Sequence, residues 1–507
     1  MASQEKGGTS WSSSLAEEII SANPDAVLYT TAAGISPSGV VHFGNFRDVA
    51  TSHLVKEALE KKGKKSRLIF SWDNFDRFRK VPAGIPDSFS EHIGKPLSKI
   101  PDPLGELSSY AERFQKPFIL AMEKLGIEIE YRDQTTLYES GVYDKMIFHA
   151  LAHRHEIADI MLSFMSEKAK GEKGIDPVAY RDNYYPIAVY SRFSGKDSTK
   201  ILSYDGATNI TYLCLETGKE DSVDLSREHI AKLAWKIDWP MRWQYEEVHF
   251  EPGGHDHASP GGSYDVAKVI SKKVFNNEPP LFVEYKFVGI QGLGSKMSGS
   301  KGNALSPLEL LDIYEPEVLK WLYFRKSPNQ SFELAFNTEI YRQYDEYDKE
   351  VGDEKAIPFR HAVSFGQIVQ WDESKLEEVL RGLGLGYSSE SISTRLPLAK
   401  NWLVKYNPDE TIELRDSVNS DYLESMTDEA KEKVRNLKSE LATGNYTDIK
   451  SLEELVYRLP KDPSLDEAEL KKAQRIFFKN VYNLLIGKDT GPRLGTFLWA
   501  VNRERVL

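Results

Sequence analysis

Two short segments far apart in the chain carry residue types suited to binding a polyphosphate. The first reads HFGN at residues 42–45, between a predicted strand over 26–31 and a predicted helix over about 45–62. A helix N-terminus attracts anions because its free backbone N–H groups point outward and its dipole is positive there. The second reads KMSGS at residues 296–300, in a run of glycine, serine and lysine. Together, in this order, they predict a site for nucleotide phosphates.

The elements around the first segment alternate as strand, helix and strand. The helix carries apolar residues on one side and is expected to end at Gly63, and a buried strand is predicted over 67–73. Such a unit predicts an α/β fold with a doubly wound parallel sheet, a Rossmann-type, HUP-like nucleotide-binding domain. The pattern resumes with strands over 247–250 and 282–288 and a helix over 266–275.

The chain divides into five predicted parts. In chain order they are a disordered tail (1–14), a catalytic domain in two pieces (15–80 and 235–303) separated by an insertion (81–234), a linking region (304–355) and an all-helical domain (356–507). In the last part, Thr427 is expected to start one helix, and Ser464 with Glu467 to form the capping box of another that ends at Gly487. A sheet split by an insertion explains the distance between the two phosphate segments.

Composition limits the class of protein. The 507 residues are 40% hydrophobic and 28% charged, with no apolar run near the roughly 18 residues of a membrane span, so we expect a soluble protein with no membrane partner. A single cysteine, Cys214, excludes an internal disulfide and fits a cytoplasmic location. The net charge of −12 argues against nucleic acid coating the whole surface, but not against a local basic face.

The two phosphate segments resemble the HIGH and KMSKS motifs of class I aminoacyl-tRNA synthetases. Further segments match in order: GISPSG (34–39), WDNFD (72–76), RKVP (79–82), IPDP (100–103), WKIDWPMRW (235–243), FEP (250–252), DH (256–257) and GGSYD (261–265). Together they resemble the class I lysyl-tRNA synthetases, most closely the bacterial ones, over about residues 15–348, with weaker support from GPRL (491–494).

The resemblance implies a lysine–tRNA ligase, which activates L-lysine with ATP and transfers it to the 3′ end of tRNA(Lys). The lysine carboxylate is itself the nucleophile, so the protein must position reactants and stabilise phosphate charge. ATP is expected with Mg²⁺ as its substrate complex. By the same resemblance, the insertion meets the acceptor stem, the linking region contacts the tRNA stem, and the helical domain binds the anticodon. A monomer is expected.

The residues expected to act on ATP come from the two phosphate segments and one later loop. Catalytic roles are expected for His42, Asn45, Lys296, Ser298, Ser300 and Lys301. ATP contacts are expected from Ser38, Gly39, His42, Gly44, Asn45, Asp256, Lys296 and Met297. Gly299 stands where many class I enzymes have a second lysine, so the working cation is expected to be Lys296, Lys301 or magnesium.

The amino-acid pocket can be argued from charge. A glutamate-specific relative needs a basic residue on the turn after the first strand, whereas this chain has Ala33 and Gly34. A lysine side chain needs an acid for its ammonium and aromatic walls for its methylene groups, and Asp73 at a strand end is the expected acid. By resemblance, Gly34, Ser36, Trp235, His257 and Tyr285 line the site with Asp73. Trp239 and Trp243 are expected in the core.

Relatives often carry paired cysteines in the insertion that bind zinc. The matching stretch here keeps only Cys214, so no structural zinc and no other metal site are expected. Two other functions stay open. A non-catalytic paralogue that binds tRNA would be expected to lose its phosphate ligands, which this chain keeps. An enzyme of the same fold charging another amino acid is disfavoured by the absence of arginine at positions 33 and 34.

Overall fold

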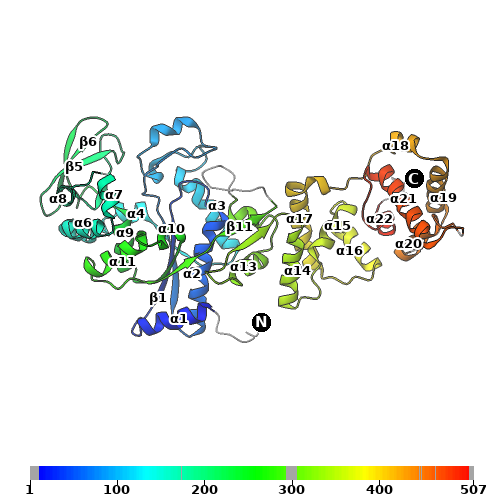
Figure 1. The fold of residues 1–507 in the computed structure, drawn as a ribbon, viewed down its shortest axis with the longest axis horizontal. Helices are drawn as coiled ribbons and strands as arrows, with labels where there is room; N and C mark the ends of the chain where they lie inside the picture. The colour runs from blue at the N-terminus through cyan, green and yellow to red at the C-terminus, as the bar shows by residue number, and fades with distance from the viewer. Residues whose placement is uncertain are drawn as a thin grey trace. The chain divides into compact units, whose positions relative to one another are not determined.

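The computed structural model describes residues 11–172, 174–292, 305–444, 446, 448–462 and 464–501 of the chain (Figure 1). They fall into two compact units. The first runs to Ile290 and also takes the described residues up to Leu311 and those from Leu319 to Leu334. The second takes Asp312–Val318 and everything from Ala335 onward, with Gln291 and Gly292. The predicted phosphate segment at 296–300 lies outside the described residues.

The first unit is built on a five-stranded parallel sheet with the order β10-β9-β1-β2-β3. Its strands are β1 (Tyr29–Ile35), β2 (Ser66–Trp72), β3 (Glu130–Asp133), β9 (Val248–Gly254) and β10 (Leu281–Tyr285). The predicted doubly wound fold is confirmed. Because β3 comes from residues expected to form an insertion, that segment also supplies an edge of the sheet.

Helices cover both faces of this sheet. Tyr29 packs with α1 (Trp11–Ala22) and α2 (Phe43–Lys61), whereas Ala32 packs with α9 (Trp235–Tyr245) and α11 (Ser263–Lys273). Residues three apart on a strand point to opposite faces, so the two apolar clusters lie on the two sides of the sheet. Burial on both faces explains why consecutive residues of these strands are buried, the first five of β1 and residues 68–70 of β2.

The strand order reverses between β1 and β9. These two strands pair through Thr30 with Val248 and Thr31 with Phe250, across a register shift, and no pairing between them is found beyond Thr31 among the described residues. Both strands nevertheless continue, β1 to Ile35 and β9 to Gly254. Ligands of doubly wound sheets bind at the carboxyl ends of the strands, at the reversal point. The fold therefore opens a crevice there.

The remaining segments of this unit are smaller elements. They include α3 (Tyr110–Lys124), α4 (Gln134–Glu139), α5 (Asp144–Ala152), α6 (Arg154–Ser163), α7 (Glu167–Glu172), α8 (Pro177–Asn183), α10 (His255–Ala258) and α12 (Pro307–Leu310). Antiparallel sheets form from β4 (Ile187–Val189) with β8 (Ala231–Leu233) and from β5 (Thr199–Tyr204), β6 (Asn209–Cys214) and β7 (Glu220–Asp224). The strand expected over 282–288 is interrupted, because β10 ends at Tyr285 and β11 (Val288–Gln291) instead pairs with β12 (Phe332–Ala335).

From Glu339 onward, the described residues of the second unit form helices and no strand, as the sequence predicts. They are α14 (Glu339–Val351), α15 (Phe359–Ile368), α16 (Glu373–Gly382), α17 (Ser389–Tyr406), α18 (Ser420–Ser425), α19 (Asp428–Thr443), α20 (Ile449–Arg458), α21 (Glu467–Ile486) and α22 (Leu494–Ala500). In the described part of the chain, no helix is both long enough and apolar enough to span a bilayer.

Three helix-end residues or pairs predicted from the sequence can be compared with the caps in the structure. Thr427 caps α19, and Gly487 ends α21 in a left-handed conformation, both as predicted. The predicted capping box of Ser464 with Glu467 is wrong: Asp466 accepts the Glu469 N–H at 2.9 Å, and Glu469 accepts that of Asp466 at 3.0 Å. Ser464 is instead bonded to Asp462 in the preceding turn, so the box lies two residues further on.

Arg47 anchors the helix that begins at the first phosphate segment. Its side chain is 2% exposed and donates to the carbonyl groups of Tyr323 at 2.8 Å, Lys326 at 3.1 Å and Ser327 at 2.8 Å. These acceptors lie at the end of α13 (Pro316–Phe324) and just beyond it. The two terminal nitrogens of this buried cation are bonded to backbone oxygens, and these bonds hold α2 in place.

Replacing Arg47 by methionine leaves these three carbonyl groups without their donor. We expect Arg47→Met to lower the free energy of unfolding by about 2–4 kcal/mol, measured by urea denaturation. Arg227→Met is the matched control because the Arg227 side chain is 85% exposed, and its effect should be about 0.5 kcal/mol or less. Equal effects of the two substitutions would contradict the anchoring role.

Candidate active site

A cavity of about 80 Å³ lies at the crevice between β1 and β9. Strand residues form its base, α9 supplies one wall, and Tyr285 of β10 and Asp48 of α2 complete it. Its lining residues are Ala32, Gly34, Asp48, Ile69, Ser71, Asp73, Trp235, Trp239, Arg242, Trp243, Glu246, Val248, Glu251, Pro252, Gly253, Gly254, His257 and Tyr285. The position is the one the strand order predicts for a ligand.

Five of the six residues expected to bind lysine line this cavity. They are Gly34, Asp73, Trp235, His257 and Tyr285, whereas Ser36 lies in a neighbouring hollow. Trp239 and Trp243 are buried, as the sequence predicts, and also reach the cavity. The tryptophans are four residues apart on α9 and so lie on one face of the helix. Trp235 stacks on Trp239, with ring centres 5.0 Å apart. The wall is therefore aromatic, as a methylene chain requires.

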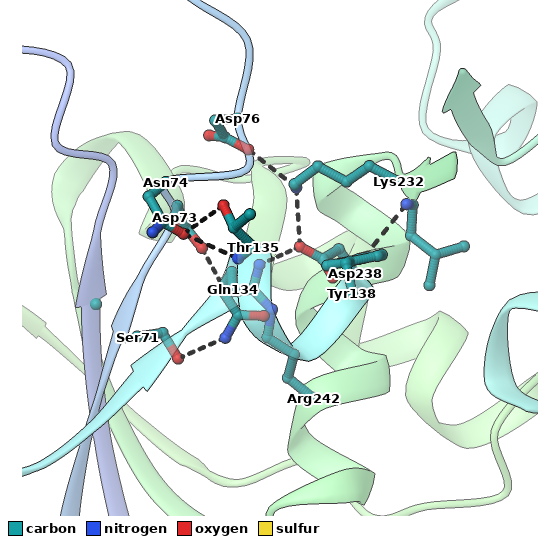
Figure 2. A network of polar contacts seen from close by, with 12 residues as sticks. Ser71, Asp73, Asn74, Asp76, Gln134, Thr135, Tyr138, Lys232, Asp238 and Arg242 are labelled. Carbon is teal, nitrogen blue, oxygen red and sulfur yellow. Dashed lines mark hydrogen bonds and ion pairs between the residues drawn. The ribbon is translucent and has the colours of Figure 1, made fainter. Parts of the chain in front are cut away.

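Asp73 already has a cationic partner. Its Oδ1 accepts a hydrogen bond from Nη1 of Arg242 at 2.6 Å, and both side chains are buried (Figure 2). Burial raises the pKa of Asp73, and the charge of Arg242 opposes that rise. The acid expected to meet the substrate ammonium is thus part of an internal ion pair, which the sequence could not reveal.

Two further carboxylates in the cavity have no such partner. Oε2 of Glu251 accepts a hydrogen bond from Trp243 Nε1 at 2.7 Å, and Oδ2 of Asp48 accepts one from the Gly34 N–H at 3.3 Å. Neither forms an ion pair within the described residues. Burial raises the pKa of Glu251 to about 7, and burial together with the charge of Glu251 raises that of Asp48 well above its usual value. Both acids are poised to receive a cation.

Sequence reasoning missed both acids, although one of them carried a signal. Glu251 lies in the FEP segment at the carboxyl end of a predicted strand, where ligand-binding residues gather. Asp48 lies in the second turn of the helix that follows the first phosphate segment. Its approach to Gly34 depends on how α2 packs on β1, and no local pattern encodes that packing.

A second hollow, of about 480 Å³, lies beside the turn after β1. Five residues expected to contact the amino acid or ATP line it: Ser36, Ser38, Gly39, His42 and Asn45. The rest of its wall is Ile35, Val40, Val41, Asp76, Arg77, Arg79, Lys80 and Pro82. Gly44 and Asp256 are not among its lining residues, and Asp256 is exposed on α10. The expected ligands Lys296, Met297, Ser298, Ser300 and Lys301 lie outside the described residues.

The N–H groups at the start of α2 are already bonded. The Gly44 N–H donates to Nδ1 of His42 at 3.0 Å, the His42 N–H donates to the Asn45 side chain at 3.0 Å, and the Phe43 N–H donates to Leu305. The predicted anion site built from free backbone groups is therefore replaced by a capping box. Because Nδ1 accepts and burial lowers the pKa of His42, the neutral ring carries its proton on Nε2.

Side-chain cations line the same hollow. Arg77 is paired with Asp197 at 3.1 Å, whereas Arg79 and Lys80 are exposed and form no ion pair within the described residues. Arg79 and Lys80 open the RKVP segment (79–82), one of the segments that resemble the family. Its two basic residues are the cations that the hollow offers to an anionic ligand.

Comparison with known proteins identifies the family of this chain. The family model described as tRNA synthetases class I (K) matches residues 9–360. The chain belongs to this family. A lysine–tRNA ligase of Streptomyces coelicolor is 36% identical over 98% of this chain and 97% of its own length. Those of Thermococcus kodakarensis (34%, over 98% of each chain) and Borreliella burgdorferi (31%, over 98% and 97%) are similar over the same extent.

In this synthetase, hydroxyl groups surround the stretch where relatives are expected to have zinc ligands. Cys214 is buried and its Sγ lies 3.7 Å from Oγ of Ser194. Burial raises the pKa of Cys214, but hydrogen bonds to Ser191, Thr217 and Ser194 lower it overall. Among the described residues there is no group of three or more histidine, cysteine or acidic side chains able to hold a metal. The Cys214 thiol is therefore hydrogen-bonded to hydroxyl groups within this stretch.

The synthetase is therefore expected to keep its stability without bound metal. Treatment with EDTA followed by dialysis should change the melting temperature, measured by circular dichroism, by less than about 1 °C, because no metal–ligand bond is lost. A larger drop that Zn²⁺ reverses would contradict this expectation. Metal analysis of the purified protein provides the control.

Proposed function

We propose that this synthetase is a lysine–tRNA ligase, which activates L-lysine with ATP and Mg²⁺ and transfers it to the 3′ end of tRNA(Lys). One observation carries the proposal: the cavity at the strand reversal holds two carboxylates, Asp48 and Glu251, that no described cation neutralises. A cationic amino acid satisfies them, and an anionic one would be repelled. The lysine–tRNA ligases similar to it over nearly their whole length support the same conclusion.

The lysine side chain would enter along the aromatic wall. Trp235 and Tyr285 flank the methylene groups, and the ε-ammonium meets Glu251 and Asp48. Asp73 acts here through Arg242 and is not the main ammonium partner. Its Oδ2 has no hydrogen-bond donor among the described residues and lies open to the α-ammonium group. Gly34 and His257 complete the mouth of the cavity.

ATP would occupy the second hollow. Nε2 of His42 donates to a phosphate oxygen, and Arg79 and Lys80 neutralise the triphosphate with Mg²⁺. The lysine carboxylate attacks the α-phosphorus, the bond to the β-phosphate bridging oxygen breaks, and pyrophosphate leaves. Ser36, Ser38, Gly39 and Asn45 are proposed to position the nucleotide. Roles for Lys296, Ser298, Ser300 and Lys301 at the leaving pyrophosphate, and for Met297 and Asp256 at ATP, remain part of the proposal.

The proposal extends to the rest of the chain. The helices after residue 355 are proposed to bind the anticodon stem of tRNA, and the segment 81–234 to meet the acceptor end. We propose a monomer that acts in the cytoplasm, where the single thiol of Cys214 stays reduced.

Lysine-dependent exchange between ATP and labelled pyrophosphate tests the activity directly. The purified protein should catalyse exchange with lysine, and glutamate should support none because Arg242, the arginine that lines the cavity, is already paired with Asp73 and Asp238. The absence of exchange with lysine, with or without tRNA, would contradict the enzyme assignment. Faster exchange with glutamate or arginine would contradict the choice of amino acid and keep the fold.

Glu251→Gln tests whether Glu251, and not Asp73 of the internal ion pair, is the main partner of the lysine ammonium. Loss of a charge-assisted contact should raise the KM for lysine by about 10–100-fold and leave the KM for ATP unchanged. Glu278→Gln is the matched control, because the Glu278 side chain is 82% exposed and pairs only with Lys272 at the surface. If Glu251→Gln behaves like this control, the ammonium lies elsewhere.

The same acid predicts how lysine binding depends on pH. The ammonium binds the ionised form of Glu251, whose pKa in the free protein is about 7. Below that pH the carboxyl group must lose a proton on binding, so the KM for lysine should rise by up to about tenfold per pH unit and level off above pH 7. The dependence should be weaker in Glu251→Gln. A KM that stays flat from pH 5.5 to 8 would contradict the assignment.

A further inference from the structure

Two charged residues that line neither hollow lie between them. Asp238 on α9 is 0% exposed, and Lys232 on β8 is 6% exposed. Neither is among the lining residues of the cavity or of the second hollow. Removing a lysine and an aspartate from water is costly, so their presence in the interior calls for a specific role.

These residues form the middle of a chain of alternating charges (Figure 2). Nζ of Lys232 lies 2.9 Å from Oδ1 of Asp76 and 3.1 Å from Oδ2 of Asp238. The same Oδ2 accepts a hydrogen bond from Arg242, which in turn holds Asp73. Followed from contact to contact, the network runs Asp76, Lys232, Asp238, Arg242, Asp73, so that negative and positive side chains alternate.

The two ends of this chain lie in different hollows. Arg242 and Asp73 line the cavity proposed for lysine, whereas Asp76 lines the hollow proposed for ATP. The side chain of Asp76 is 24% exposed, so its charge reaches whatever occupies that hollow. The network therefore connects two binding sites through residues that touch neither ligand.

The two central residues keep their charges inside the protein. Burial opposes the charge of Lys232, but Asp238 and Asp76 raise its pKa above the usual value. Burial likewise opposes ionisation of Asp238, but Arg242, Lys232 and the hydroxyl of Tyr138 lower its pKa overall. That hydroxyl donates to Oδ1 of Asp238 at 2.5 Å. Each central charge is thus compensated on both sides.

We propose that Lys232 and Asp238 are positioning residues that set the charge each substrate meets. Lys232 compensates Asp76 beside the nucleotide hollow, and Asp238 compensates Arg242 in the wall of the amino-acid cavity. Without Lys232, the triphosphate would meet an uncompensated carboxylate. Without Asp238, Arg242 would keep only Asp73 as a partner, and the substrate ammonium would meet a guanidinium whose charge is only partly compensated. This inference rests on the proposed function for which substrate each hollow takes.

Lys232→Met tests the nucleotide side. We expect the KM for ATP in pyrophosphate exchange to rise about tenfold, while the KM for lysine stays within about twofold. The double variant Lys232→Met with Asp76→Asn removes the exposed carboxylate as well, and should recover most of the affinity for ATP. If Lys232→Met does not fold, as judged by circular dichroism, Lys232→Gln with and without Asp76→Asn makes the same comparison.

Asp238→Asn tests the amino-acid side. The KM for lysine should rise about tenfold with the KM for ATP within about twofold, which is the opposite pattern to Lys232→Met. Tyr138→Phe is the control, because it removes one hydrogen bond from the same carboxylate and leaves every charge in place. Its effect on either KM should be less than about threefold.

The outcomes separate this inference from a purely structural role. If both variants raise both KM values alike, or if Asp76→Asn fails to rescue Lys232→Met, the network only holds the fold and the inference is overturned. Absence of exchange in the wild-type protein would instead overturn the proposed function. In that case, calorimetric titration of the wild type and variants with ATP and with lysine still tests whether each substitution changes the predicted affinity.

Discussion

The separation of β1 and β9 at their carboxyl ends is the constraint on which the site depends. A doubly wound sheet must reverse its strand order once, and here the two central strands stay paired only near Thr30 and Thr31. Beyond Thr31, the two strands no longer pair, and their residues instead border a cavity. Residues of α2 on one face of the sheet and of α9 on the other also line it. On its other side β1 stays paired with β2, and there a Cβ at Gly34 would lie 2.9 Å from the carbonyl oxygen of Ser71.

Charge then gives the crevice its chemical character. Four acids, Asp48, Asp73, Glu246 and Glu251, and one arginine, Arg242, line the cavity. Glu246 forms ion pairs with Arg67 and Arg132, which do not line the cavity. Arg242 forms ion pairs with two aspartates. What remains is a negative surplus against an aromatic wall. Such a pocket favours a cation with a long apolar stem over an anion of similar size.

Local patterns determined how much of this arrangement could be predicted from the sequence. Caps and apolar periodicity located α2, α19 and the end of α21, because those signals act within one or two turns. The short edge strand β3 was missed, because four residues carry too little pattern. The pairing of Asp73 with Arg242 joins residues 169 positions apart, and only the packed fold reveals it. Motif resemblance and charge located five of the residues that line the cavity and five that line the second hollow, but not their hydrogen-bond partners.

His42 has two duties that are hard to separate. Its ring caps α2 through Nδ1, and the opposite nitrogen is the one left for a ligand. A truncation at this position would remove the helix cap together with any ligand contact, so a loss of activity in His42→Ala would not identify its cause. Asparagine is itself a good N-cap, but it has no N–H group at the position of the Nε2–H of His42. The histidine is thus a place where a helix cap and a proposed substrate contact share one ring, so a replacement would have to serve both.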